Sequence, residues 1–197
     1  MNLESYRETK SKFLSGDYSG EKFFRENDCF LEYGYCKFLQ GKLDEAKQSF
    51  DKIKSFDFRA SWALKLIQFI LSSNITMPSY FQIRNFLEID LNLLLQAGQA
   101  EFIENILKYS DLLYKINPET YKFISRVMLN NNFEDVAIYY LMKAKDKFYY
   151  DPEMHFMLAN CYIKKGDKSL AKESLKVCLS ILPRYYPAKK LLDSLSS

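Results

Sequence analysis

One histidine and two pairs of adjacent carboxylates are the residues of this chain best able to do acid and base chemistry. A hydrolase that used His155 as a base would also need an oriented nucleophile, and no Gly-x-Ser-x-Gly elbow is present to supply one. A phosphate-binding glycine loop is absent as well. The pairs Asp44/Glu45 and Glu134/Asp135 each follow an expected turn, where carboxylates complement the dipole at the start of a helix. We therefore predict that the protein is not an enzyme, that it uses no cofactor, and that His155 has a packing or surface role.

The four cysteines could be metal ligands or two disulfides. Cys29 and Cys36 are seven residues apart and would share one helix face, but two thiols without a nearby histidine or further cysteine make a poor zinc site. A chain of this size and apolar content does not need disulfides for stability. We predict free thiols and no metal site.

The composition predicts a globular protein with a substantial core. The chain has 197 residues, of which 48% are hydrophobic, and its few glycines and prolines form no linker. Charges interrupt the first ten residues, and the most apolar segment, Trp62 to Leu71, is too short to cross a bilayer. We expect a single domain over 1–197, located in the cytoplasm and not inserted in a membrane.

The net charge of +3 is unevenly distributed. From Pro118 onward, 13 Lys and Arg stand against 9 Asp and Glu, an excess of +4. This excess favours an acidic partner for the second half of the chain. It is well below the dense basic stripe that is typical of nucleic-acid binding.

The strongest pattern in the sequence is a repeat of 34 residues. Asn117-Pro118-Glu119 and Asp151-Pro152-Glu153 are matching triplets at this offset, and each has the composition of a helix start. The same offset pairs Asn132 with Gly166, where a left-handed residue would end the first helix of a hairpin. It also pairs small residues, at which two antiparallel helices would approach closely, namely Ser125 with Ala159, Ala137 with Ala171 and Ala144 with Cys178.

This pattern resembles the tetratricopeptide repeat, and the resemblance is clearest over 118–185. The small, aromatic and proline positions of the family are matched by Leu158, Ala159, Tyr162, Gly166, Ala171, Leu175, Cys178 and Pro183. Repeat 118–151 departs from the family at Asn132, in place of glycine, and at Tyr149, in place of proline. The resemblance implies an all-α superhelical array of antiparallel helix hairpins, an α-solenoid with regular repeats at 118–151 and 152–185.

Residues 1–117 are expected to hold irregular repeats. A degenerate hairpin is predicted at 84–117 with its turn at Gly98, and motif-like residues surround Gly41. These two glycines are 57 residues apart, which is no multiple of 34, so an insertion must lie between them. We expect the insertion to hold a helix from about 58 to 72, followed by a helix that begins at the capping-box pair Ser79 and Gln82. At the other end, 186–197 is predicted to form a capping helix that is amphipathic from Pro187 to Leu195.

The resemblance also implies a binding surface, because the first helix of each hairpin in this family lines a concave groove. The corresponding residues are Lys122, Arg126, Leu129, Asn130, Phe156, Asn160, Ile163 and Lys164. The family's carboxylate-clamp pattern is not matched, since Arg126, Met157, Pro187 and Leu191 stand at clamp positions. The leading hypothesis is an adaptor, scaffold or assembly subunit that binds a protein segment, with an acidic one favoured.

Two alternatives stay open at this stage. The groove residues could simply form solvated helix faces. The basic excess and the 15 Tyr and 16 Phe could also indicate a helical-repeat RNA-binding protein, although the helical spacing of most aromatics fits a packed core. A homo-oligomer is not indicated by any pattern in the sequence.

Overall fold

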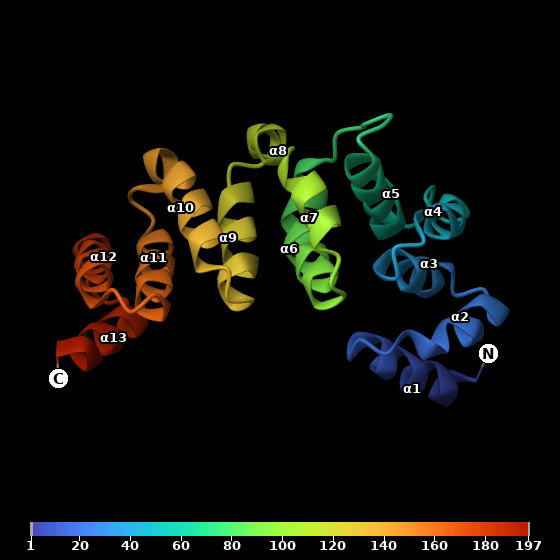
Figure 1. Ribbon diagram of the computed structural model, residues 1–197, viewed down its shortest axis with the longest axis horizontal. Helices are drawn as coiled ribbons and strands as arrows, with labels where there is room; N and C mark the ends of the chain where they lie inside the picture. Colours follow the sequence, from blue (N-terminus) through green and yellow to red (C-terminus); the bar gives the residue numbers. More distant parts are fainter. Residues whose placement is uncertain (1, 197) are drawn as a thin grey trace. The chain divides into compact units, whose positions relative to one another are not determined.

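The computed structural model describes residues 2–196, and that part of the chain contains helices and no strand (Figure 1). It divides into two compact units, 1–116 and 117–197, each of which is described by itself. The predicted all-α fold is confirmed. A single repeat domain over 1–197 stays a prediction.

The N-terminal unit is a series of helices of unequal length. They are α1 (Leu3–Leu14), the 3-10 helix η1 (Tyr18–Gly20), α2 (Glu21–Glu26), α3 (Phe30–Leu39), α4 (Leu43–Asp51), α5 (Phe58–Leu71), α6 (Tyr80–Gln96), α7 (Ala100–Leu107) and α8 (Ser110–Ile116). The helix predicted at 58–72 is confirmed as α5, whose first turn is capped by the Asp57 carboxylate. The predicted capping box of Ser79 and Gln82 is also confirmed, at the start of α6.

Helices α3 and α4 form a close hairpin around a glycine. Gly41 ends α3 with a φ of +79°, a left-handed conformation that glycine adopts without steric cost. Within α3, Gly34 leaves no room for a side chain, because a Cβ there would lie 2.4 Å from a ring carbon of Phe50. The Phe50 ring is fully buried and packs at its edge against Tyr35, with 5.3 Å between ring centres.

A buried polar cluster joins α5 to α6. The Asp90 carboxylate accepts hydrogen bonds from Trp62 Nε1 at 2.5 Å and from Arg59 Nη2 at 2.9 Å. Asp90 is almost fully buried, and this desolvation raises the pKa of its carboxyl group to about 6, against the opposing influence of Arg59. The cluster therefore joins α5 to α6 across the connection between them.

The hairpin predicted at 84–117 is partly corrected by the structure. Its turn at Gly98 is confirmed, with a φ of +72°, but its first helix begins earlier, at Tyr80. Its second half is two helices, α7 and α8, rather than one. A turn at Lys108 and Tyr109 separates these two helices. The Tyr109 ring stacks on the Phe69 ring of α5, with 5.0 Å between ring centres.

The C-terminal unit is a regular row of helices. It contains α9 (Thr120–Asn130), α10 (Glu134–Phe148), α11 (Pro152–Lys164), α12 (Lys168–Ile181) and α13 (Tyr186–Ser196). Consecutive helices lie side by side (Figure 1). The small residues predicted at the close approaches are all fully buried, namely Ser125, Ala137, Ala144, Ala159, Ala171 and Cys178. The predicted turns are confirmed, because Asn132 and Gly166 have φ values of +63° and +80°.

The two matching triplets start their helices differently. Helix α11 begins at Pro152 as predicted, with the Asp151 carboxylate accepting from the Glu153 N–H at 2.9 Å. Helix α9 begins only at Thr120, two residues after Pro118. There the Asn117 side chain accepts from the backbone N–H of Glu119, so the triplet forms a separate turn before the helix.

The predicted capping helix is confirmed as α13. Its buried Ala188 packs in one cluster with Ala159, Leu175 and Cys178 of α11 and α12. Leu191, Leu192 and Leu195 of the same helix cover this cluster as partly buried side chains. Among the described helices, none is both long and apolar enough to span a bilayer.

Candidate functional site: a groove between α9 and α11

The structure brings most of the predicted groove residues together. A cavity of about 400 Å³ is lined by Arg126, Leu129 and Asn130 of α9, by Glu153, Phe156, Met157, Asn160, Ile163 and Lys164 of α11, and by Tyr185 just before α13. We call this the α9–α11 groove. Seven of the eight residues predicted from the sequence line it. That these residues bind a partner stays a prediction.

Lys122, the eighth residue, was wrongly placed in the groove. Its side chain is only 6% exposed, and its ammonium group lies 2.6 Å from the Asp151 carboxylate and 4.9 Å from the centre of the Phe148 ring. Burial alone would lower the pKa of Lys122, but the hydrogen bond to Asp151 and the negative charges of Asp151, Glu119 and Glu153 together outweigh burial and raise this pKa. Lys122 therefore joins α9 to the N-terminal cap of α11 and serves the fold.

The cations that do line the groove have partners within the chain. Arg126 Nη2 lies 2.6 Å from Glu153 Oε1. Lys164 Nζ donates to the Leu129 carbonyl and to Asn132 Oδ1, both at 2.8 Å, and lies 3.7 Å from a Glu134 oxygen. The positive charge expected from the sequence is thus largely compensated at this surface.

The floor of the groove is apolar and its amides are partly unused. Leu129 and Met157 are buried, and the Phe156 ring lies 5.4 Å from the Tyr185 ring, centre to centre. Asn160 Nδ2 donates to the Phe156 carbonyl of its own helix at 2.8 Å. An amide has two N–H donors and one carbonyl acceptor, so Asn160 retains one of each for a ligand.

Three groove residues were missed by the sequence reasoning, which did not assign Glu153, Met157 or Tyr185 to the groove. Glu153 belongs to the triplet that marks the start of α11, and its contact with Arg126 spans 27 positions of sequence. Met157 lies next to Phe156 on the same helix, and Tyr185 comes from the turn after α12. The only signal for them is the 34-residue register, which places whole helices but not individual neighbours.

The histidine, the carboxylate pairs and the cysteines considered above for chemistry lie in the core or at helix starts. A packing or surface role was predicted for His155, and the structure shows the packing role, because the side chain is buried and its Nε2 lies 2.7 Å from the Tyr149 carbonyl oxygen. The carboxylate pairs stand in the first turns of α4 and α10, as predicted. Burial raises the pKa of the Cys36 thiol to about 12 and that of Cys161 to about 11. Across residues 2–196, no group of three or more potential metal-binding side chains is found.

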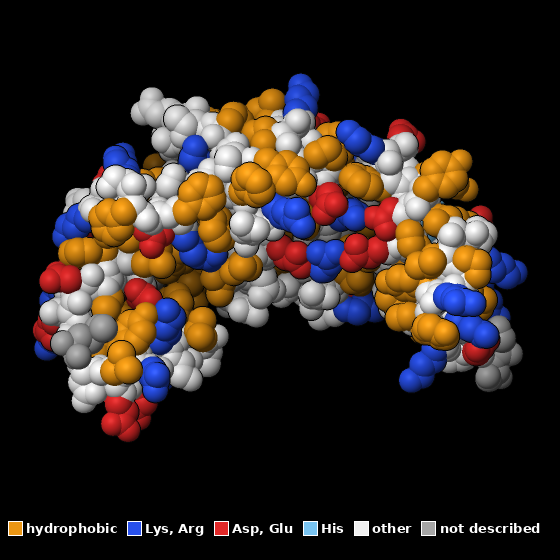
Figure 2. All heavy atoms as spheres, turned by 180° about the vertical axis from the view of Figure 1, so that it is seen from behind, with side chains coloured by type: hydrophobic (Ala, Val, Ile, Leu, Met, Phe, Trp, Pro, Cys, Tyr) orange, Lys and Arg blue, Asp and Glu red, His pale blue; other side chains and the backbone are white. Residues whose placement is uncertain are grey.

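The charged side chains of the surface are mixed in sign. On the face seen in Figure 2, Lys and Arg side chains lie beside Asp and Glu side chains, and exposed aromatic and aliphatic side chains lie between them. A nucleic-acid-binding face is typically a continuous block of positive charge.

Two segments of the chain match models of a known protein family. Models of the tetratricopeptide repeat match residues 152–185, which are α11 and α12 with the turn that follows, and residues 28–56, which include α3 and α4. A comparison with curated proteins gives no significant match.

Proposed function

Because the chain is a tetratricopeptide-repeat protein, we propose that it binds a segment of another protein in the α9–α11 groove and carries out no chemistry of its own. Repeats of this family generally mediate interactions between proteins. The observation that carries the proposal for this groove is its combination of an apolar floor with amide side chains that keep free donors and acceptors.

The apolar floor would supply most of the affinity. A side chain of the partner that sat against Phe156 and Tyr185 would remove apolar surface from water, at about 25 cal/mol for each Å² buried. The side chains of Asn130 and Asn160, which line the same groove, would bond to the partner's backbone, which recognises an extended segment whatever its side chains are.

The ion pairs of the groove change the expected chemistry of the partner. Arg126 and Lys164 already have carboxylate neighbours, so an acidic segment would have to displace Glu153 or Glu134 to gain a new ion pair. We therefore propose a segment whose main contribution is an apolar side chain. Charge would act on the rate of association more than on affinity.

A photocrosslinking amino acid at position 160 tests whether the groove is the site. The same amino acid at Lys176, which is exposed on α12 and lies outside the groove, is the matched control. We expect a protein from the native extract to crosslink at position 160 and not at position 176. The amount of crosslinked product should not fall when the extract is treated with nuclease first. Equal crosslinking at both positions would exclude the groove, and crosslinking to RNA would support the RNA-binding alternative.

Once the crosslinked segment is known, its affinity can be measured by calorimetry. Asn160→Ala should weaken it by about 1 to 3 kcal/mol, the cost of leaving partner groups unpaired. The melting temperature should change little, because the hydrogen bond that this substitution removes joins Asn160 to Phe156 of its own helix and not to another helix. Unchanged affinity would show that Asn160 does not contribute to binding, and loss of folding would show that Asn160 is a structural residue.

A further inference from the structure

The connection between α5 and α6 departs from the rest of the chain. Eight residues, 72–79, join these two helices, whereas the turns between α3 and α4, α6 and α7, α9 and α10, and α11 and α12 each take three. Ser72 and Asn74 both have left-handed backbones, with φ values of +51° and +49°. We call residues 72–79 the inserted segment.

Side chains of α5 hold the inserted segment in place. Gln68 Oε1 accepts from Thr76 N at 3.0 Å and from Thr76 Oγ1 at 2.6 Å. Lys65 Nζ donates to the Met77 carbonyl oxygen at 2.8 Å, and Pro78 is buried. These three hydrogen bonds join the inserted segment to α5.

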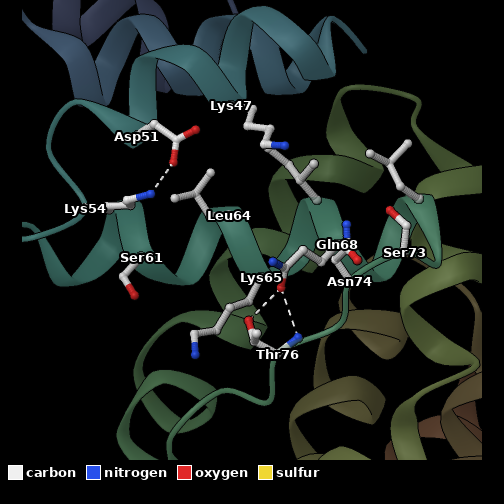
Figure 3. Close-up of a pocket in the computed structure, with 12 residues that line it drawn as sticks. Lys47, Asp51, Lys54, Ser61, Leu64, Lys65, Gln68, Ser73, Asn74 and Thr76 are labelled. Atoms are coloured by element: carbon white, nitrogen blue, oxygen red, sulfur yellow. Dashed lines mark hydrogen bonds and ion pairs between the residues drawn. The ribbon is translucent and has the colours of Figure 1, made fainter.

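A pocket of about 600 Å³ lies between the inserted segment, α5 and α4 (Figure 3). Its volume is within the range of ligand-binding pockets in proteins. Three lysines line it, namely Lys47 of α4, Lys54 after α4 and Lys65 of α5, and Asp51 is the only carboxylate among the described lining residues. Leu64 and Leu71 supply apolar surface in the same pocket.

Two of the three lysines lack an anionic partner. Lys54 Nζ lies 2.7 Å from Asp51, but Lys65 bonds only to the Met77 carbonyl among the described residues. Lys47 is exposed, has no hydrogen bond or ion pair within residues 2–196, and extends toward the pocket (Figure 3). Partial burial without a counter-charge lowers the pKa of Lys65. In the α9–α11 groove, by contrast, each cation has a carboxylate neighbour.

We propose that this pocket is a second binding site, which takes an acidic peptide segment whose carboxylates pair with Lys47 and Lys65 and whose aliphatic side chain packs on Leu64 and Leu71. The excess of positive charge selects for carboxylates. A free phosphate fits the site less well, because phosphate sites in proteins are built from converging backbone N–H groups or arginine forks. The Thr76 N–H is already bonded to Gln68, and no arginine lines the pocket among the described residues.

This site is independent of the α9–α11 groove, since all its described lining residues belong to the N-terminal unit. A fluorescently labelled peptide of alternating glutamate and leucine is a suitable probe, and its glutamine and leucine counterpart is the control peptide. Binding to the full chain is measured by fluorescence anisotropy at 50 mM and 300 mM salt. We expect the glutamate peptide alone to bind, and its affinity to fall at the higher salt.

The variant Lys47→Glu tests the site at a side chain that is exposed and has no hydrogen bond or ion pair within residues 2–196. Combined with Lys65→Gln, which keeps a donor near the Met77 carbonyl, it should weaken peptide binding about tenfold, the sum of two exposed or half-exposed ion pairs. The matched control is Lys168→Glu with Lys176→Gln on α12, which changes the net charge by the same amount at two exposed lysines outside both pockets. It should leave binding unchanged.

Three results would overturn the proposal. The first is an absence of binding by the glutamate peptide, and the second is an equal loss of binding in the α12 control variant, which would indicate attraction to net charge alone. The third is displacement of the peptide by inorganic phosphate at equal ionic strength, which would assign the pocket to small anions. Groove variants such as Asn160→Ala should leave this binding unchanged, so failure here and failure of the groove proposal are distinguishable.

Discussion

Gly34→Ala is expected to destabilise the N-terminal unit, although alanine is the better helix former. An ideal Cβ at position 34 would lie 2.4, 2.7 and 2.9 Å from three ring carbons of Phe50, whereas ordinary carbon contacts begin near 3.4 Å. The ring is fully buried and packs on Tyr35, so it has no free space to enter. Overpacking at such a site costs about 3 kcal/mol, and the glycine-to-alanine exchange within a helix returns about 1 kcal/mol. The net loss of unfolding free energy is therefore about 2 kcal/mol.

Urea unfolding followed by tryptophan fluorescence measures this loss. The chain has one tryptophan, Trp62, which is fully buried in α5 and so reports on the unit that contains Gly34. With an m-value of about 2 kcal/mol/M, the midpoint should fall by about 1 M.

A double-mutant cycle with Phe50→Leu separates the clash from other effects. The smaller side chain makes room, so the double variant should be more stable than the sum of the two single changes predicts, by about 2 kcal/mol. Gly98→Ala is the control, because a Cβ there meets nothing within 4 Å and the cost is backbone strain alone. Phe50→Leu should not relieve that cost. A neutral or stabilising Gly34→Ala, or additive effects in the cycle, would refute the reasoning.

Three further outcomes are expected. The pKa of Asp90 in the folded state is about 6, above its ordinary value, so protonation of Asp90 favours the folded state and this stabilisation is lost as the pH rises through 6. When the pH is lowered from 7 to 5, the unfolding free energy of the wild type should rise by about 1 kcal/mol relative to that of Asp90→Asn. A difference between the two proteins that does not change with pH would contradict this. Truncation after Tyr185 should cause aggregation or less cooperative melting, because it uncovers the cluster beneath α13; an equally stable truncated chain would show that α13 is not a cap. With the disulfide reagent DTNB at pH 8, the half-buried Cys29 should react in the native state, while the buried Cys36, Cys161 and Cys178 should react only on unfolding. Burial raises the pKa of all four thiols, so the expected difference depends on access to the reagent; prompt reaction of all four would argue against the buried positions.

The sequence by itself determined the helical hairpins of the C-terminal unit. Each hairpin packs mainly on its neighbours in the chain, so a 34-residue register is enough to align the small residues Ser125 and Ala159 and the turns at Asn132 and Gly166. The helix starts near Asp57 and Ser79 were also predictable, because an N-cap bonds to backbone N–H groups within three residues of itself. The register also identified most of the α9–α11 groove.

Only the tertiary structure decided which charged groups are compensated. The ion pair of Lys122 with Asp151 joins positions 29 apart in the sequence, and that of Arg126 with Glu153 joins positions 27 apart. Whether such groups meet depends on the rotation of each helix and on the rotamer of each side chain. Composition placed the excess of positive charge in the C-terminal half, but the structure neutralises the groove cations there and leaves Lys47 and Lys65 without carboxylate partners in the N-terminal unit. Spacing along one helix predicts its faces. Pairing between helices depends on their packing, which no local pattern records.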